Sequence, residues 1–133
     1  MSEENLEIVR RAIAAFNARD NSAWNELTAA DIEIHPVPEW PENSVVRGRD
    51  DVWDFLIGNE TAWEGGDYIL TEEAVAGETV LACVERAVAG KESGVPVGDL
   101  RFYGVFEVRD RELVRGDYFL SRDQALESAG LSE

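Results

Sequence analysis

The sequence predicts an α+β fold, in which a curved antiparallel sheet packs against N-terminal helices and a short helix ends the chain. Apolar residues first recur every three or four positions, the period changes to two from Tyr68 onward, and a helical pattern returns after Ser121. Helices followed by a run of strands are typical of the α+β class. Because there is no internal repeat, linker or low-complexity segment, we expect residues 1–133 to form a single domain.

Two helices are predicted before the first strand. The first begins at Ser2, a residue that can cap it, and its apolar stripe consists of Leu6, Val9, Ile13 and Phe16. In the second, Ser22 is the predicted N-cap, and Trp24 and Leu27 are expected on the buried side.

A third helix is predicted after Gly48, with Val52 on its buried side. The last helix starts with a capping box formed by Ser121 and Gln124. It is expected to end at Gly130, since glycine readily adopts the left-handed conformation that follows many helices.

The first predicted strand carries three potential metal ligands on one face. Asp31, Glu33 and His35 alternate with Ile32 and Ile34, so the polar and apolar side chains project to opposite faces. A solvated polar face is the simpler interpretation, and no metal or cofactor is expected.

The segment "GVFEVRDRELVRGDYFL" predicts a β-hairpin. A loop of two residues (Asp110 and Arg111) or of four gives the same register. The predicted cross-strand pairs are Val108 with Leu113, Phe106 with Arg115, Gly104 with Asp117, and Phe102 with Phe119.

This register surrounds one carboxylate with apolar side chains. Asp117 would share a face with three phenylalanines, and Gly104 opposite it would leave a gap beside the acid. If Arg86 on the preceding strand lay beside Gly104, its guanidinium could reach Asp117 across the glycine. The alternatives are a buried Arg86–Asp117 pair that only fixes the strand register, or an Asp117 that faces water.

The charge of the chain limits its partners. With 28 acidic and 12 basic residues the formal net charge is −16, which disfavours nucleic acid and anionic membranes as partners. The single cysteine, Cys83, excludes an internal disulfide, and the N-terminus has no signal-peptide core. A cytoplasmic location is therefore expected.

The order of three segments resembles the SnoaL-like branch of the nuclear transport factor 2-like superfamily over essentially the whole chain. These segments are "AFNARDNSAWNELTAADIEIH", "VVRGRDDVWDFL" and "GVFEVRDRELVRGDYFL". The resemblance implies a cystatin-like cone, in which a curved sheet surrounds a helix-lined pocket, usually in a homodimer. It also implies isomerase, dehydratase, cyclase or epoxide hydrolase activity, or non-catalytic binding.

Within that superfamily, the strands are most similar to those of limonene-1,2-epoxide hydrolases. Arg86 and Asp117 match an Arg and an Asp of that family's catalytic set, whereas Val88 stands where a second Asp is expected. Ile34 and Pro36 stand where a Tyr and an Asn orient water. The missing acid disfavours epoxide opening, which needs a proton donor and a base in the same step.

These observations lead to one functional hypothesis and its alternatives. Asp117 would be the acid or base of a proton-transfer enzyme of the isomerase, dehydratase or cyclase type, with Arg86 as its partner. The alternatives are a non-catalytic ligand-binding or interaction module with a structural Arg86–Asp117 pair and, third, an epoxide hydrolase-like enzyme. The residues expected to hold a hydrophobic substrate are Phe102, Gly104, Phe106, Phe119, Val88, Ile34, Trp40 and Phe16.

Two further expectations concern the surroundings of the pocket. Trp40 and Trp63 lie in predicted loops, where either could cover its mouth. Both faces of the hairpin are largely apolar, so we expect helices on one face of the sheet and a second subunit of a homodimer on the other.

Overall fold

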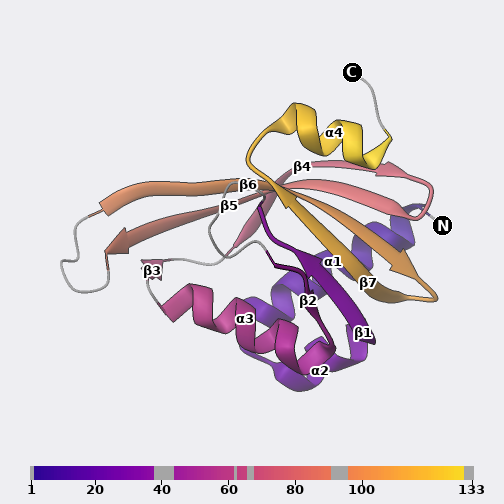
Figure 1. Ribbon diagram of the computed structural model, residues 1–133, viewed down its shortest axis with the longest axis horizontal. Helices are drawn as coiled ribbons and strands as arrows, with labels where there is room; N and C mark the ends of the chain where they lie inside the picture. Colours follow the sequence, from indigo (N-terminus) through magenta and orange to yellow (C-terminus); the bar gives the residue numbers. More distant parts are fainter. Residues whose placement is uncertain (1, 38–43, 62, 66–67, 91–95, 131–133) are drawn as a thin grey trace.

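The fold consists of helices on both sides of one sheet (Figure 1). The computed structural model describes residues 2–37, 44–61, 63–65, 68–90 and 96–130. The helices are α1 (Ser2–Asn17), α2 (Asn21–Leu27), α3 (Arg49–Thr61) and α4 (Arg122–Ala129). The strands are β1 (Thr28–His35), β2 (Val46–Arg47), β3 (Trp63–Gly65), β4 (Ile69–Ala76), β5 (Thr79–Gly90), β6 (Pro96–Arg109) and β7 (Glu112–Phe119).

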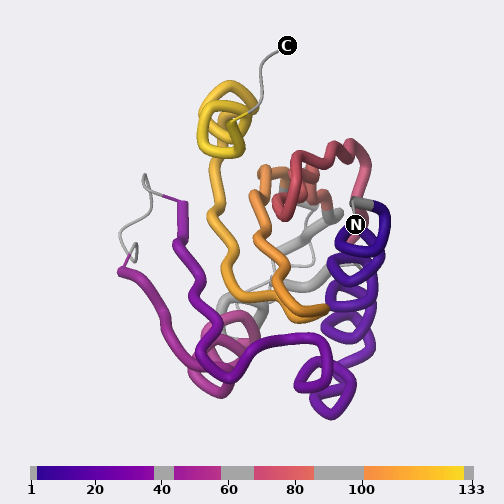
Figure 2. The backbone as a smooth tube through the Cα atoms, turned by 90° about the vertical axis from the view of Figure 1, so that its right-hand side faces the viewer, coloured from indigo at the N-terminus to yellow at the C-terminus, as the bar shows by residue number. Residues whose placement is uncertain are grey.

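The strand order is β2-β1-β7-β6-β5-β3, and β4 also pairs with β5. The predicted α+β class is confirmed, with one addition: β1 and β7 run parallel, so the otherwise antiparallel sheet is mixed. α1, α2 and α3 lie on one side of the sheet and α4 on the other (Figures 1 and 2). We call the side of α1 to α3 the inner face and the side of α4 the outer face.

The first two helices begin near the predicted positions, but the cap of α2 differs. Trp24 is buried as predicted. The N-cap is Asp20 rather than Ser22, because the Asp20 carboxylate accepts a hydrogen bond from the backbone N–H of Ala23 at 3.1 Å. The helix thus starts one residue before Ser22, which is exposed.

The other two helices start where the sequence predicts, and α4 also ends at the predicted residue. α3 begins after Gly48, whose φ of 95° suits glycine, and Val52 is fully buried. In α4 the Ser121 hydroxyl accepts from the N–H of Gln124, and Gly130 adopts the left-handed conformation.

The hairpin between β6 and β7 contains a bulge that the sequence did not predict. The loop has two residues, Asp110 and Arg111, both with positive φ. Val108 faces Leu113 as predicted, but Glu107 faces Arg115, so Val114 is an extra residue in β7.

Beyond this bulge the predicted register is wrong by one residue. Gly104 pairs with Tyr118, and Asp117 pairs with Val105. Because side chains alternate between faces, a shift of one residue moves every later side chain of β7 to the opposite face. Tyr118 therefore lies on the inner face with Phe102, whereas Asp117 and Phe119 lie on the outer face.

The main core lies between the inner face and helices α1 to α3. It contains Val9 of α1, Ile32 of β1, Val84 of β5 and Phe106 of β6, all no more than 1% exposed. A smaller cluster on the outer face joins Tyr103 and Val105 to Ala125 and Leu126 of α4. α4 thus covers part of the apolar outer face for which a second subunit was expected.

The predicted Arg86–Asp117 pair required Arg86 to lie beside Gly104, and the register of β5 does not place it there. The residue opposite Gly104 is Ala82, whereas Arg86 pairs with Leu100. Four residues of extended strand separate these positions by about 13 Å. The register on which the predicted bridge over Gly104 depended is therefore not the one observed.

Candidate functional site

Aromatic side chains of the inner face and of the helices packed against it form a continuous series of ring contacts, which we call the aromatic wall. The ring of Tyr118 lies 5.1 Å from that of Phe102 and 6.0 Å from that of Phe106, centroid to centroid. Phe102 contacts Tyr68, which in turn contacts Phe16 of α1 at 5.8 Å. These tilted and edge-to-face arrangements are favourable for aromatic pairs.

The wall continues from Phe16 to two tryptophans. Phe16 contacts Trp53 of α3 at 5.6 Å, and Trp53 contacts Trp24 of α2 at 5.5 Å. Tyr68 and Trp53 are only half-buried although both pack against the main core. The helix layer therefore does not close completely over the aromatic wall.

The two glycines of the hairpin make room for a ring, not for a carboxylate. A Cβ on Gly104 would lie 2.5 Å from the Phe106 ring, and one on Gly116 would lie 3.1 Å from Ile34 Cδ1. The sequence predicted an empty gap beside Gly104, next to Asp117. The Phe106 ring occupies that space instead. A larger residue at either position would push against the inner core.

Tyr118 contributes a polar group to this apolar wall. Burial raises the pKa of its hydroxyl above the usual value for tyrosine, and the nearby Tyr68 and Asp117 raise that pKa further. Tyr118 therefore remains protonated at neutral pH, so its O–H can donate a hydrogen bond to a ligand oxygen but does not act as a base.

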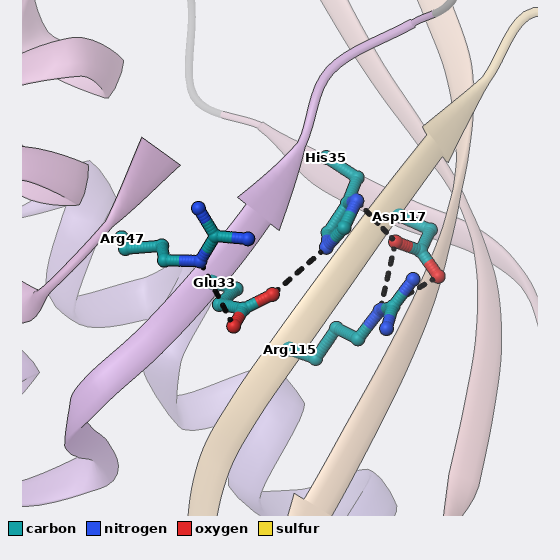
Figure 3. A network of polar contacts seen from close by, with 5 residues as sticks. All are labelled: Glu33, His35, Arg47, Arg115 and Asp117. Carbon is teal, nitrogen blue, oxygen red and sulfur yellow. Dashed lines mark hydrogen bonds and ion pairs between the residues drawn. The ribbon is translucent and has the colours of Figure 1, made fainter. Parts of the chain in front are cut away.

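Asp117 belongs to a polar network on the outer face (Figure 3). The Nε of Arg115 donates to the two oxygens of Asp117 at 3.1 and 3.2 Å. His35 Nδ1 lies 3.8 Å from Asp117 Oδ1, and the Nε2 of the same ring lies 3.1 Å from Glu33 Oε1. Asp117 therefore pairs with Arg115 of its own strand, and its side chain is 15% exposed.

Glu33 links this network to β2. The Nε of Arg47 donates to Glu33 Oε2 at 3.3 Å. The hydrogen bond with His35 is the main reason why the pKa of Glu33 is lower than usual; partial desolvation opposes this effect, and Arg47 adds to it. As predicted, the polar residues of β1 lie opposite the buried Ile32 and Ile34.

The structure brings together only part of the predicted site. Four of the expected substrate contacts belong to the inner core: Phe16, Ile34, Phe102 and Phe106. Phe119 packs against the outer cluster instead, since it follows the bulge. Trp40 and the side chains of Arg86, Val88 and Trp63 lie outside the described residues, so their predicted roles stay predictions.

Tyr118 and Tyr68 belong to the inner wall but were not among the predicted site residues. A hairpin without a bulge would place Tyr118 on the opposite face from Phe102, because the bulge inverts the side chains of β7 that follow it. The bulged residue, Val114, is β-branched and gives no glycine or proline signal. For Tyr68 a signal was present, since it is the first residue of the period-two pattern.

The described part of the chain contains neither a cluster of metal ligands nor a membrane-spanning helix. Among residues 2–37, 44–61, 63–65, 68–90 and 96–130, no group of three or more His, Cys, Asp or Glu side chains could hold a metal ion. In this same part of the chain, no helix combines the length and apolarity needed to cross a membrane.

Solved structures with the same fold cover nearly the whole chain. A nuclear transport factor 2-like protein from Burkholderia xenovorans LB400 is 23% identical, with a TM-score of 0.76 and coverage of 97% of both chains. TerC, co-crystallised with polyporic acid, is 19% identical, with a TM-score of 0.75 and coverage of 96% of this chain and 98% of its own. Rv0760c from Mycobacterium tuberculosis, in complex with estradiol-17β-hemisuccinate, is 16% identical, with a TM-score of 0.73 and coverage of 92% and 97%.

The sequence itself identifies the family. No curated protein matches the chain. The model of the SnoaL-like domain matches residues 9–116, which include most of the helices and strands described above. The protein therefore belongs to the SnoaL-like family.

Proposed function

We propose that this protein binds a hydrophobic small molecule against the aromatic wall of the inner face. The observation that carries the proposal is the incomplete burial of large aromatic side chains that face the helix layer. Tyr68, Phe102 and Tyr118 are in contact with the core, yet each is only half-buried. Apolar surface of this kind, next to a few polar groups, is characteristic of ligand pockets.

Two polar groups on this side would orient the ligand. The protonated hydroxyl of Tyr118 would donate to a carbonyl or hydroxyl oxygen. The indole N–H of Trp24 is buried and has no hydrogen-bond partner among the described residues. Since an unpaired buried donor is costly, a ligand oxygen that accepts from it would contribute to binding. The ligands bound by TerC and by Rv0760c support a small molecule as the partner.

The enzymatic reaction that we propose is a cofactor-independent isomerisation, dehydration or cyclisation. A hydrogen bond from Tyr118 to a carbonyl oxygen would stabilise the negative charge that develops when a neighbouring C–H loses its proton. Such a reaction also needs a base. Asp117 does not supply this base, because it lies on the outer face of the sheet, where its carboxylate pairs with Arg115.

That position of Asp117 favours a second candidate, which is a ligand-binding module without turnover. With Asp117 on the opposite face, the described residues of the aromatic wall offer hydrogen-bond donors, which bind and orient a molecule but do not move a proton from carbon. An epoxide hydrolase-like reaction has the same difficulty, since it also needs a base for water.

Ligand binding can be tested with estradiol as a probe, by following the quenching of tryptophan fluorescence. Phe102→Leu and Tyr118→Phe should each weaken binding, the second by about tenfold if the hydroxyl donates to the ligand. Phe119→Leu is the matched control, because it makes the same change to a ring on the outer face. Equal effects of Phe102→Leu and Phe119→Leu, or no binding at all together with no co-purifying molecule in a native mass spectrum, would contradict the proposal.

Turnover separates the two candidates. A β,γ-unsaturated ketosteroid is a suitable first substrate, because its isomerisation to the conjugated ketone is visible in the ultraviolet. Conversion that Tyr118→Phe slows supports the enzyme. Binding without conversion, across such ketones and related cyclisation substrates, supports the binding module.

We also propose that the protein forms a homodimer through the outer face of the sheet. α4 covers only part of the outer cluster, since Phe119 of β7 and Ala74 of β4 pack against it but are only partly buried. A second copy that also covered Arg47 of β2, whose side chain is 68% exposed, would have to pair its charge, because burying a charge without a partner is unfavourable. Light scattering should give about twice the chain mass of 14.8 kDa, and the monomer mass at all concentrations would contradict this proposal.

A further inference from the structure

A row of polar side chains crosses the outer face of the sheet from β2 to β5. Each member is the direct cross-strand neighbour of the next: Arg47, Glu33, Arg115, Glu107 and Thr79. The first four alternate in charge, and opposite charges at such positions normally attract each other across the strands.

In the middle of this row, the expected ion pair is not formed. Arg115 directs its Nε to Asp117, two residues along the same strand. Glu107 accepts instead from Arg109 through Oε2. Within the described residues, this leaves the two terminal nitrogens of Arg115 and the Oε1 of Glu107 without partners.

A cavity lies where these two side chains separate. Its volume is about 240 Å³, slightly less than that of pockets for drug-sized ligands. β5, β6, β7 and α4 all contribute to its lining, which consists of Thr79, Val105, Glu107, Arg115, Asp117 and Ser128. It thus combines a guanidinium, two carboxylates, two hydroxyls and one apolar side chain.

We propose that this cavity binds a small zwitterion of the amino-acid class. The carboxylate of the ligand would accept from the terminal nitrogens of Arg115, a group whose planar geometry suits carboxylates. Its ammonium group would donate to Glu107, and Thr79 and Ser128 offer hydroxyls to either end. The ligand would therefore bridge the two halves of the open cross-strand pair.

The charge of the protein favours a zwitterion over an anion or a simple cation. A net charge of −16 repels anions, and Glu107 and Asp117 add to this repulsion locally. A cation would gain from the carboxylates but would face the guanidinium of Arg115. A zwitterion carries no net charge and can pair with both the guanidinium and the carboxylates. It would bind on the opposite side of the sheet from the aromatic wall, so this inference is independent of the ligand site proposed there.

Titration of the isotope-labelled full-length protein with L-alanine, followed by NMR, tests the proposal. Propionate and ethylamine are matched probes, since each lacks one of the two charged groups of alanine. L-Alanine should shift the amide signals of β6, β7 and α4, and both analogues should bind at least about tenfold more weakly. Equal binding of alanine and either analogue, or shifts spread evenly over the surface, would overturn the proposal.

Variants locate the two contacts. Glu107→Gln keeps the shape of the side chain and should weaken alanine binding by about tenfold, as should Arg115→Gln. Arg47→Gln is the control, because Arg47 belongs to the same row but not to the cavity lining. An unchanged affinity in a folded Glu107→Gln variant would overturn the proposal. So would the result that alanine does not bind while both cavity variants shift the monomer–dimer equilibrium, since the cavity would then belong to an interface between copies.

Discussion

Asp117 lies directly opposite Val105 in the β6–β7 ladder, one residue away from the pairing that the hairpin loop alone would give. The shift arises at Val114, which is inserted between Leu113 and Arg115. Because of this extra residue, the carboxylate of Asp117 and the phenol of Tyr118 each lie on the face opposite to the one that the loop alone would give. The acid points toward α4, and Tyr118 joins the aromatic wall on the inner face.

The first prediction concerns this exchange. Asp117→Asn should change the affinity for a ligand of the inner face by less than about threefold, whereas Tyr118→Phe should weaken it by about tenfold, because only the phenol is on that face. Binding of estradiol to both variants measures the difference. The stability of Asp117→Asn should fall by no more than about 1 kcal/mol, since its partner Arg115 is half-exposed.

A larger effect of Asp117→Asn than of Tyr118→Phe on ligand affinity would contradict the assignment of the two side chains to their faces. Arg115→Gln provides a control for the loss of the ion pair itself, because it removes the partner but leaves the carboxylate of Asp117 in place.

Much of the fold follows from local patterns that the sequence displays. The stripe that includes Val9 and Phe16, the alternation of Ile32 and Ile34 with polar residues, and the capping residues Ser121 and Gly130 all predict what is observed. These features depend on neighbours a few positions away. The loop register at Val108 and Leu113 is of the same kind.

The candidate site was harder to predict, because it depends on the register between strands over a longer distance. A β-bulge at a valine has no distinct residue signature, yet it inverts every side chain after it. The cap of α2 shows the same limit on a smaller scale. Asp20 and Ser22 are both suitable caps by residue type, and only the backbone geometry selects Asp20.

The second prediction tests the close contact between Gly104 and Phe106. Gly104→Ala should destabilise the protein by about 1–3 kcal/mol, because the new methyl group would overlap the Phe106 ring. In a Phe106→Leu background the same substitution should cost less, since the smaller side chain leaves room. Urea denaturation of the four proteins gives the coupling energy. Additive effects would show that the ring does not occupy the space beside the glycine.

The third prediction distinguishes the two possible caps of α2. Asp20→Ala should destabilise the protein by about 1 kcal/mol, because it removes the acceptor for the N–H of Ala23. Ser22→Ala is the matched control and should change the stability by less than about 0.5 kcal/mol, since Ser22 is an exposed residue within the helix. Thermal unfolding of both variants is sufficient, and the reverse order of the two effects would restore Ser22 as the cap.

The fourth prediction concerns acid stability and Glu33. Its pKa in the folded protein is lower than the usual 4.5, mainly because of the hydrogen bond with His35, so the folded state holds this proton less readily than the unfolded state. The stabilisation from Glu33 is therefore complete above pH about 4.5 and is lost as the pH falls through the folded pKa. Glu33→Gln should lower the melting temperature near neutral pH, and the difference from the wild type should shrink as the pH falls below about 4.5.

Glu78→Gln is a suitable control, since Glu78 is an exposed carboxylate without an ion pair among the described residues. A difference between wild type and Glu33→Gln that stays constant from neutral to acid pH would mean that the hydrogen bond with His35 does not favour the ionised form of Glu33.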